Sequence, residues 1–264
     1  MKRWIPFLKS GPRVHVVRLQ GAIGAPGRSS MSDRSVAPML EKAFKGKPDA
    51  VALEINSPGG SPVQSSLIGA RIRRLAEEKD VPVYAFCEDV AASGGYWIAS
   101  AADEIWGDAS SILGSIGVIS SGFGAHVLLQ RQGIERRVHT AGKSKSMLDP
   151  FRPETEEDVA RLNRLLEQLH ATFIAQVKAR RGDKLADDPD LFTGEVWIGQ
   201  SAVDVGLADG VGHLVPMMKK RFGDKVSFRR FEAKKPLLPR LGMQAVQGAL
   251  GEIEERAEFA RFGL

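Results

Sequence analysis

Two glycine pairs, each directly after an apolar run, are the segments of this chain best suited to chemistry. They are Asn56-Ser57-Pro58-Gly59-Gly60 and Ala91-Ala92-Ser93-Gly94-Gly95. An apolar run that ends in glycine is typical of a buried strand turning into a helix, where backbone N–H groups are free to point at an anion. Two such turns at the ends of neighbouring strands favour an oxyanion hole beside Ser93, a candidate nucleophile. The plainer interpretation is two structural turns with Ser93 as a helix N-cap.

A serine nucleophile needs a base, and both histidine and lysine are available. None of the five histidines stands in a motif that nominates it, so a Ser-His-Asp triad stays open without support. A lysine must be desolvated until its pKa falls from about 10.4 to roughly 7–8, a shift of about 4 kcal/mol. Lys145 precedes the partly apolar stretch 146–150, and Lys143 is its local competitor. Spacing alone does not choose between them.

Strand-like and helix-like segments alternate, which predicts an α/β architecture to position these residues. Strands are expected at 14–19, 51–55, 83–87, 104–107, 116–120 and 135–139, with a loop at 88–92. Helices are expected at 35–45, 61–79, from Ser93 onward, at 124–132, 155–181 and 242–262. The apolar residues expected on one face of the second and of the longest helix are Leu67, Ile68, Ile72 and Leu75, and Val159, Leu162, Leu166, Leu169, Phe173 and Val177.

Composition favours one large α/β domain. The 264 residues are 43% apolar, enough for one sizeable core. The net charge of +5 comes from interspersed basic and acidic residues without an aromatic-basic motif, so no nucleic-acid partner is expected. Cys87 is the only cysteine, which excludes an intrachain disulfide and metal sites built on several cysteines. It follows an apolar run and is expected in the core; neither a cofactor nor a metal is predicted.

The sequence lacks a run of about 20 apolar residues that would span a bilayer. Its N-terminus begins like a signal peptide, but the apolar run there contains Pro6 and is shorter than the usual 7–15 residues or so. We therefore expect a cytoplasmic protein without a signal peptide or transmembrane segment. Trp4, Phe7 and the flanking lysines allow a weak peripheral contact at the inner membrane.

Four motifs, taken together, resemble one known family. The two glycine-rich turns, the second extended to Tyr96, are followed by Gly114-Ser115-Ile116-Gly117-Val118 and Lys145-Ser146-Met147-Leu148-Asp149-Pro150. In this order they resemble the signal peptide peptidase A (protease IV) family of serine peptidases, as does the closing run 194–212. The match covers about 50–215. It implies an α/β fold of the Clp/crotonase-like type, with repeated ββα-type units, to which this chain adds a C-terminal helical extension.

The resemblance also implies a role for each matched residue. Ser93 would be the nucleophile, and Lys145, chosen over its neighbour, the general base of a Ser-Lys dyad. Ser115 would hold the lysine by a hydrogen bond, and the N–H groups of Gly60 and Gly94 would form the oxyanion hole. The implied reaction is hydrolysis of peptide bonds through an acyl-enzyme.

Family resemblance further implies partners. Peptide substrates, apolar or derived from signal peptides or unfolded proteins, would add as an extended strand beside 116–120. Relatives assemble into rings or domes, so a homo-oligomer is expected. Many relatives carry an N-terminal membrane anchor, and some are tandem duplications with the nucleophile and base in different halves. This chain resembles a single half-length unit that holds both.

Three regions and three alternatives complete the sequence-based prediction. The regions are an N-terminal strand and loop at 1–34, a peptidase domain at 35–215, and an extension at 216–264 with a linker at 234–239 and an amphipathic helix. A caseinolytic peptidase would need a histidine soon after Ser93, and the stretch 112–124 has none. An acyl-CoA enzyme of the crotonase fold would have no use for a Ser-Lys pair. A non-catalytic scaffold that binds peptides or membrane proteins would normally have lost one of the two residues.

Overall fold

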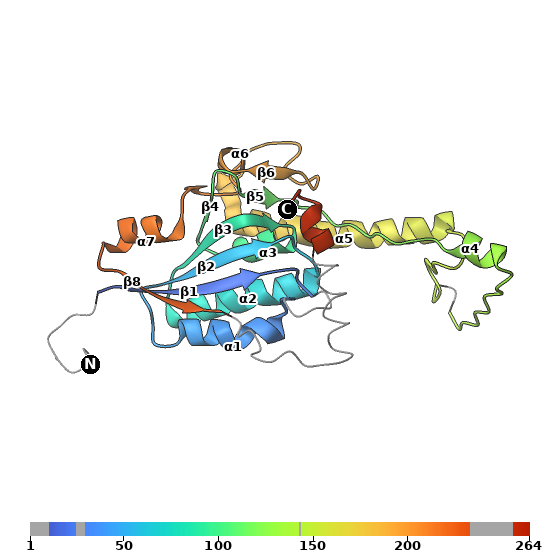
Figure 1. Ribbon diagram of the computed structural model, residues 1–264. Helices are drawn as coiled ribbons and strands as arrows, with labels where there is room; N and C mark the ends of the chain where they lie inside the picture. Colours follow the sequence, from blue (N-terminus) through green and yellow to red (C-terminus); the bar gives the residue numbers. More distant parts are fainter. Residues whose placement is uncertain (1–10, 25–29, 143, 233–255) are drawn as a thin grey trace.

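The computed structural model describes residues 11–24, 30–142, 144–232 and 256–264 (Figure 1). The strands in these ranges are β1 (Arg13–Gln20), β2 (Ala50–Ser57), β3 (Val83–Ala92), β4 (Glu104–Gly107), β5 (Ile112–Gly114), β6 (Val196–Ile198), β7 (Gly210–Val211) and β8 (Ser227–Phe231). The helices are α1 (Asp33–Phe44), α2 (Pro62–Lys79), α3 (Gly94–Ala99), α4 (His126–Arg131), α5 (Glu156–Arg181), α6 (Gln200–Asp204) and α7 (Leu214–Phe222), with a 3-10 turn at Gly182–Lys184. The predicted α/β class is confirmed.

The strands form one sheet whose main path runs β6-β5-β3-β2-β1-β8, with β4 pairing β3 and β7. The pairs are parallel except β5 with β6, which are antiparallel. The carboxyl ends of β2 and β3 therefore lie side by side, and the two glycine-rich turns that follow them meet at one edge of the sheet. Strands β1 and β8 pair with each other in this sheet. They lie in the two regions that the sequence analysis placed before and after the peptidase domain.

Helices pack on both faces of the sheet, where its strands carry apolar side chains. All eight residues of β2 are buried. Leu53 and Ile55 belong to a large core shared with α1, α2 and α3, whereas Ala50 and Ala52 belong to a smaller core with Leu214 of α7. Figure 1 shows α1 and α2 beneath the sheet and α7 at its other side.

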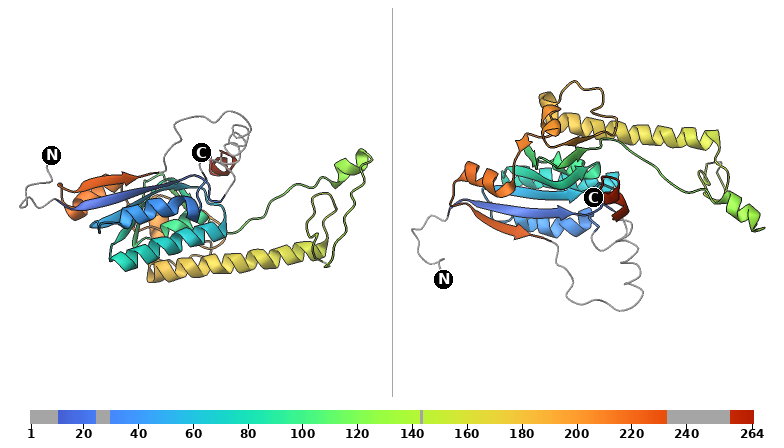
Figure 2. Two further views of the ribbon diagram at one scale, coloured as in Figure 1. Left: turned by 90° about the horizontal axis from the view of Figure 1, so that it is seen from below. Right: turned by 45° about the horizontal axis from the view of Figure 1, so that its top comes forward.

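Helix α5 is the longest element and only part of it packs on the body. Its ends follow the sequence signals: Thr155 accepts a hydrogen bond from the N–H of Asp158, and Gly182 terminates the helix. Its buried residues are Phe173, Val177 and Arg181, all in its second half. The first half projects from the body with α4 near its far end (Figures 1 and 2). We call residues 118–169, which leave and return to the body, the arm.

Most predicted elements are confirmed, with four corrections. The range 88–92 is not a loop, since β3 continues to Ala92 by pairing with β5 at residues 90–92. The ranges 116–120 and 135–139 are not strands, because they lie outside the ladders of the sheet. Leu67 of α2 is not in the core but 46% exposed. The apolar stripe of α5 is buried only from Phe173 onward.

Part of the prediction falls outside the described residues. This concerns the N-terminal segment with Trp4 and Phe7, the linker at 234–239 and most of the helix expected at 242–262. Residues 256–260 of that range are helical. No helix within the described ranges has both the length and the apolarity to cross a membrane.

Replacing Tyr96 by phenylalanine should lower the free energy of unfolding without changing the shape of the core. The Tyr96 side chain is fully buried, and its hydroxyl donates a 2.8 Å hydrogen bond to the carbonyl of Leu207. Tyr96→Phe leaves that carbonyl unpaired, at an expected cost of about 1–3 kcal/mol. Urea unfolding followed by circular dichroism measures the difference. An unchanged midpoint would contradict the buried hydrogen bond.

Candidate active site

Ser93 occupies a strained turn between β3 and α3. Its backbone lies at φ 51° and ψ −119°, a region that residues other than glycine seldom adopt. The N–H of Ser93 donates to the carbonyl of Gly114 at 2.8 Å, and its carbonyl accepts from Trp97. Although Ser93 stands at the N-cap position, its side chain does not cap α3. The side chain instead lines a cavity, as that of a nucleophile on a strand-to-helix elbow would.

The two glycine-rich turns pack backbone against backbone beside Ser93. A Cβ on Gly59 would lie 2.8 Å from both the amide nitrogen of Gly94 and the Cβ of Ser93. A Cβ on Gly60, at φ 137°, would collide with the carbonyl oxygen of Ile23. Only glycine fits either position without displacing neighbouring backbone.

The N–H groups of Gly60 and Gly94 are directed away from the surrounding hydrogen-bond ladder. Ile23 donates to Gly59 and accepts from Ser61, so the bonds of this bridge flank Gly60 and leave its own N–H pointing to the other side. Gly94 is the first residue of α3, where a helix offers its N–H no acceptor. Both residues line the same cavity as Ser93.

That cavity has a volume of about 740 Å³ and is lined by both polar and apolar side chains. The polar ones include Ser93 and Ser115. The apolar wall is formed by Trp97, whose ring stacks on Phe173 at 5.1 Å, and by Leu169 of the same helix. Glu258, Arg261 and Phe262, from the described C-terminal residues, line its rim.

Ser115 reaches the cavity through a second turn with positive φ. It follows β5 directly, at φ 49°, and its N–H donates to the carbonyl of Glu195 at 2.7 Å. The preceding Gly114 accepts the hydrogen bond from the Ser93 N–H. One backbone hydrogen bond thus joins the two turns that carry Ser93 and Ser115.

Lys145 is the one predicted site residue that the structure does not bring to this cavity. Ser93, Gly60, Gly94 and Ser115 line it, and Lys145 does not. Lys145 is exposed on the arm, in a segment near the far end of α5 (Figure 2). Its competitor Lys143 lies outside the described residues. Ser93 therefore has the predicted oxyanion donors in its cavity but not the predicted base.

Sequence reasoning missed the apolar wall of the cavity. The spacing of Phe173 and Leu169 predicts a core stripe on the longest helix, because helical spacing does not distinguish a core from a pocket. Trp97 follows Ser93 by one helical turn, and that spacing was the only signal for it.

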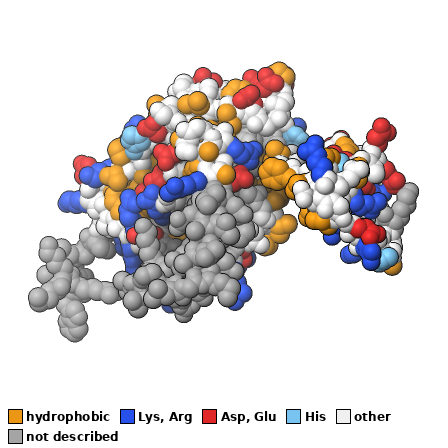
Figure 3. Space-filling view, turned by 45° about the vertical axis from the view of Figure 1, so that its right-hand side comes forward, with side chains coloured by type: hydrophobic (Ala, Val, Ile, Leu, Met, Phe, Trp, Pro, Cys, Tyr) orange, Lys and Arg blue, Asp and Glu red, His pale blue; other side chains and the backbone are white. Residues whose placement is uncertain are grey.

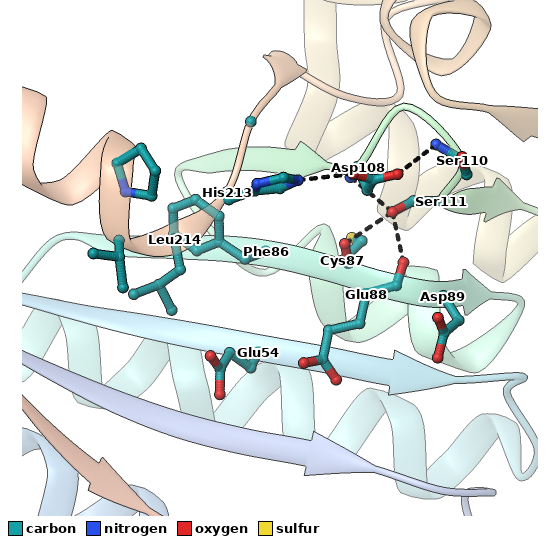
Figure 4. Close-up of a pocket in the computed structure, with 13 residues that line it drawn as sticks. Glu54, Phe86, Cys87, Glu88, Asp89, Asp108, Ser110, Ser111, His213 and Leu214 are labelled. Atoms are coloured by element: carbon teal, nitrogen blue, oxygen red, sulfur yellow. Dashed lines mark hydrogen bonds and ion pairs between the residues drawn. The ribbon is translucent and has the colours of Figure 1, made fainter.

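A second cavity, of about 410 Å³, lies between the sheet and the start of α7 (Figure 4). There the Nε2 of His213 is 2.7 Å from the carboxylate of Asp108, and this hydrogen bond holds the pKa of Asp108 below its ordinary value. The nearby hydroxyl of Ser111 donates to the backbone carbonyls of Cys87 and Glu88 instead of pointing at the histidine. These residues do not form a Ser-His-Asp triad.

Burial raises the pKa of two further groups that line this second cavity. It raises the pKa of Glu88, an effect that nearby Arg18 opposes. Burial likewise raises the pKa of the Cys87 thiol to about 12, as a core cysteine requires. Within the described ranges, no three His, Cys, Asp or Glu side chains are grouped as metal ligands would be.

None of the histidines in the described residues lines the Ser93 cavity. His15 is buried, with its Nδ1 2.5 Å from the carbonyl of Ala43. His170 lies behind the cavity wall, its Nε2 2.9 Å from the carbonyl of Ile116. The geometry therefore gives no support to a histidine base.

Comparison with known proteins identifies the relatives of this chain. A family model described as Peptidase family S49 matches residues 75–221. The chain is 49% identical over its whole length to the Na⁺/H⁺ antiporter NhaA of Brucella melitensis, of which it covers 39%. It is 32% identical over 66% of its length to a signal peptide peptidase SppA of Enterococcus faecium, of which it covers 49%. The chain thus spans less than half the length of either relative.

A solved structure supports the fold. The 1510-N membrane-bound stomatin-specific protease, in complex with a substrate peptide, matches 92% of this chain and 99% of its own, with a TM-score of 0.53. At 14% sequence identity the likeness concerns the fold alone. The predicted α/β fold of the Clp/crotonase-like type is confirmed.

Adding a methyl group at Gly94 should destabilise the protein through one side-chain contact. A Cβ there would collide with the hydroxyl of Ser65 on α2, so Gly94→Ala should cost about 1–3 kcal/mol of unfolding free energy. Removing that hydroxyl with Ser65→Ala should recover part of the loss, because the two changes are coupled. Thermal and urea unfolding of the four proteins in this cycle give the coupling energy.

Gly95→Ala is the matched control for this cycle. Its Cβ would lie 2.5 Å from the backbone carbonyl oxygen of Ser57, which no side-chain change removes. Ser65→Ala should therefore leave the cost of Gly95→Ala unchanged. Equal recovery for both glycines would contradict the packing described at the Ser93 turn.

Proposed function

The chain belongs to peptidase family S49, and from this premise we propose that it is a serine protease with Ser93 as its nucleophile and Lys145 as its general base. The observation that carries the proposal is the strained Ser93 turn, which opens onto a cavity beside the N–H groups of Gly60 and Gly94. The protein then acts as an endopeptidase that forms an acyl-enzyme on Ser93.

Each group has a distinct part in the reaction. Neutral Lys145 accepts the Ser93 proton while the oxygen attacks the substrate carbonyl, and the N–H groups of Gly60 and Gly94 bind the oxyanion that forms. One such donor typically contributes about 2.7–4 kcal/mol to stabilising the transition state. The lysine returns the proton to the leaving amine, and water then hydrolyses the ester by the same route. Ser115, in the same cavity, orients the lysine through its hydroxyl.

We propose that a second copy of the chain supplies the lysine. A lysine works as a base only once contact with protein has displaced water from its amine. Lys145 is exposed on the arm, so docking of the arm on another molecule would both bury it and bring it to a Ser93. The active assembly is then a homo-oligomer.

The surface of the arm supports this assembly. Large apolar side chains gather where the arm meets the body on the face shown in Figure 3, and others continue along it. Those more than one third exposed are Ile119, Phe123, Val127, Leu128, Ile134, Val138, Phe151, Leu165 and Leu169. On the body, Val63 and Leu67 of α2 are 62% and 46% exposed and follow Pro62 at the rim of the cavity. Contact between these two surfaces would remove apolar area from water and place the partner's arm over Ser93.

The cavity favours extended peptides with an apolar side chain next to the cleaved bond. Trp97, Phe173 and Leu169 offer an apolar wall beside Ser93. Residues 117–121 also line the cavity, outside any strand, so their backbone is available to pair with a substrate main chain. Segments of signal peptides and of unfolded proteins are substrates of this kind. The Enterococcus relative is named a signal peptide peptidase, which agrees with the first of them. A cytoplasmic location and a weak membrane contact stay predictions.

The Brucella relative bears the name of an ion antiporter, and the family match favours peptidase activity for the region shared with this chain. A peptide-binding scaffold without catalysis is the second candidate function. It would use the same cavity, and the exposed Lys145 is the observation in its favour. The following assays separate the two.

Removing either member of the proposed dyad should abolish peptide cleavage. Ser93→Ala and Lys145→Ala should each lower kcat by roughly 10³-fold or more, because neither residue can act without the other. Lys143→Ala, two positions from the base, is the matched control and should retain activity. Cleavage of an apolar leader-like peptide is followed by mass spectrometry. Full activity of Lys145→Ala would remove the lysine from the mechanism, and a wild type that binds but never cleaves would favour the scaffold.

Mixing the two inactive variants should restore activity. If one copy supplies Ser93 and its neighbour Lys145, an equal mixture places both residues at about a quarter of the sites, assuming random assembly. Activity should therefore recover to about one quarter of wild type after the chains have exchanged. A mixture that exchanges subunits but stays inactive would show that both residues act within one chain.

A further inference from the structure

The root of the arm is closed by a hydrogen bond between two distant parts of the chain. The chain leaves the body after Ile116 and returns along α5, where His170 is the last half-buried residue before the packed Phe173. The Nε2 of His170 lies 2.9 Å from the carbonyl oxygen of Ile116. A carbonyl oxygen can only accept, so the imidazole carries its proton on Nε2 and donates it.

This hydrogen bond lies directly behind the proposed active site. Ile116 is fully buried, whereas its neighbours Ser115 and Gly117 both line the Ser93 cavity. On the helical side, Leu169 precedes His170 and also lines the cavity. His170 thus ties the wall that carries Ser115 to the wall that provides the apolar surface.

The other hydrogen bonds of this segment join backbone groups outside α5, while the buried side chain of Ile116 belongs to the same core cluster as Phe173. Ser115 donates to the carbonyl of Glu195, and Gly117 donates back to Ser115 at 2.9 Å. Gly117 also packs against Gly194, closely enough that a Cβ on Gly117 would lie 3.1 Å from the Cα of Gly194. Beyond Gly117 the chain passes into the arm, so the His170 bond fixes the angle between the outgoing segment and α5.

We propose that His170 is a positioning residue, which sets the direction of the arm and thereby the place of Lys145 relative to the Ser93 that it serves. The inference rests on the proposed dyad and extends it to a residue behind the site. His170 touches neither substrate nor the reacting atoms. Its effect passes through Ile116, and a small angular error at the root becomes a larger displacement at the far end of the arm.

Three variants test this role. His170→Phe keeps a ring but removes the donor, His170→Gln keeps a donor of similar length, and Thr172→Val is the matched control. The hydroxyl of Thr172 bonds only one turn back within α5, to the carbonyl of Gln168, so its loss perturbs the helix without reaching Ile116. If His170→Phe does not fold, His170→Asn is used in its place. The shorter asparagine side chain keeps an N–H donor but cannot bring it to the carbonyl of Ile116.

Steady-state kinetics should show a loss in kcat. A misplaced catalytic group costs up to about 100-fold, so His170→Phe should lower kcat about 10- to 100-fold with KM within about threefold of wild type. His170→Gln should restore kcat to within about threefold, and Thr172→Val should leave it unchanged. An unchanged kcat in His170→Phe, a change in KM alone, or an equal loss in Thr172→Val would each overturn the proposal.

Hydrogen exchange gives a readout that does not depend on catalysis. The hydrogen-bonded amides of Ser115 and Gly117 should exchange faster in His170→Phe than in wild type and Thr172→Val, because the segment that carries them has lost its bond to α5. This result together with an inactive wild type would mean that the arm is positioned as described and that the proposed peptidase activity is wrong. Unchanged exchange at the root of the arm would overturn the role of His170 itself.

Discussion

The backbone of Ser93, held at φ 51° and ψ −119°, is the constraint on which the rest of the site depends. Such a conformation persists only where its surroundings determine it. Here the Ser93 N–H is bonded to Gly114 at the end of β5, and the turn packs against Gly59 so closely that only glycine fits. Parallel pairing of β2 with β3 and of β3 with β5 brings these three turns together, so the sheet orders the cavity before any substrate arrives.

The described chain combines a preformed cavity with an exposed lysine. The proposed nucleophile and oxyanion donors are fixed by the sheet, whereas Lys145, the proposed base, is carried by an arm whose apolar surface faces water. Under the proposed mechanism, an isolated chain would have a nucleophile without a base, and assembly would activate the enzyme. Burial on assembly would also supply the desolvation that a lysine base needs. The same contact would thus create the oligomer and its catalytic activity.

Sequence patterns predicted the fold well and the site in part, for physical reasons. Apolar runs identified β1 and β2, and the capping residues Thr155 and Gly182 located both ends of α5. They did not show that α5 leaves the body before Phe173, because an exposed apolar stripe has the same helical spacing as a buried one. The sequence did not predict the short β5, because three residues that end in glycine are too few to show a periodic pattern. Its pairing with β3 is also the reason why residues 90–92 are strand and not loop. The glycine pairs predicted the cavity. No local sequence pattern indicates which surface an exposed side chain such as Lys145 contacts.

The central claim is that Ser93 is an activated nucleophile, and covalent labelling tests it most directly. The assembled wild-type protein is treated with a serine-directed fluorophosphonate, and the adduct is located by peptide mapping with mass spectrometry. The account predicts a single adduct on Ser93, lost in Lys145→Ala and retained in Lys143→Ala. A protein that cleaves peptides but carries its adduct on another serine, or stays unlabelled while the reagent abolishes cleavage, would contradict the assignment of Ser93.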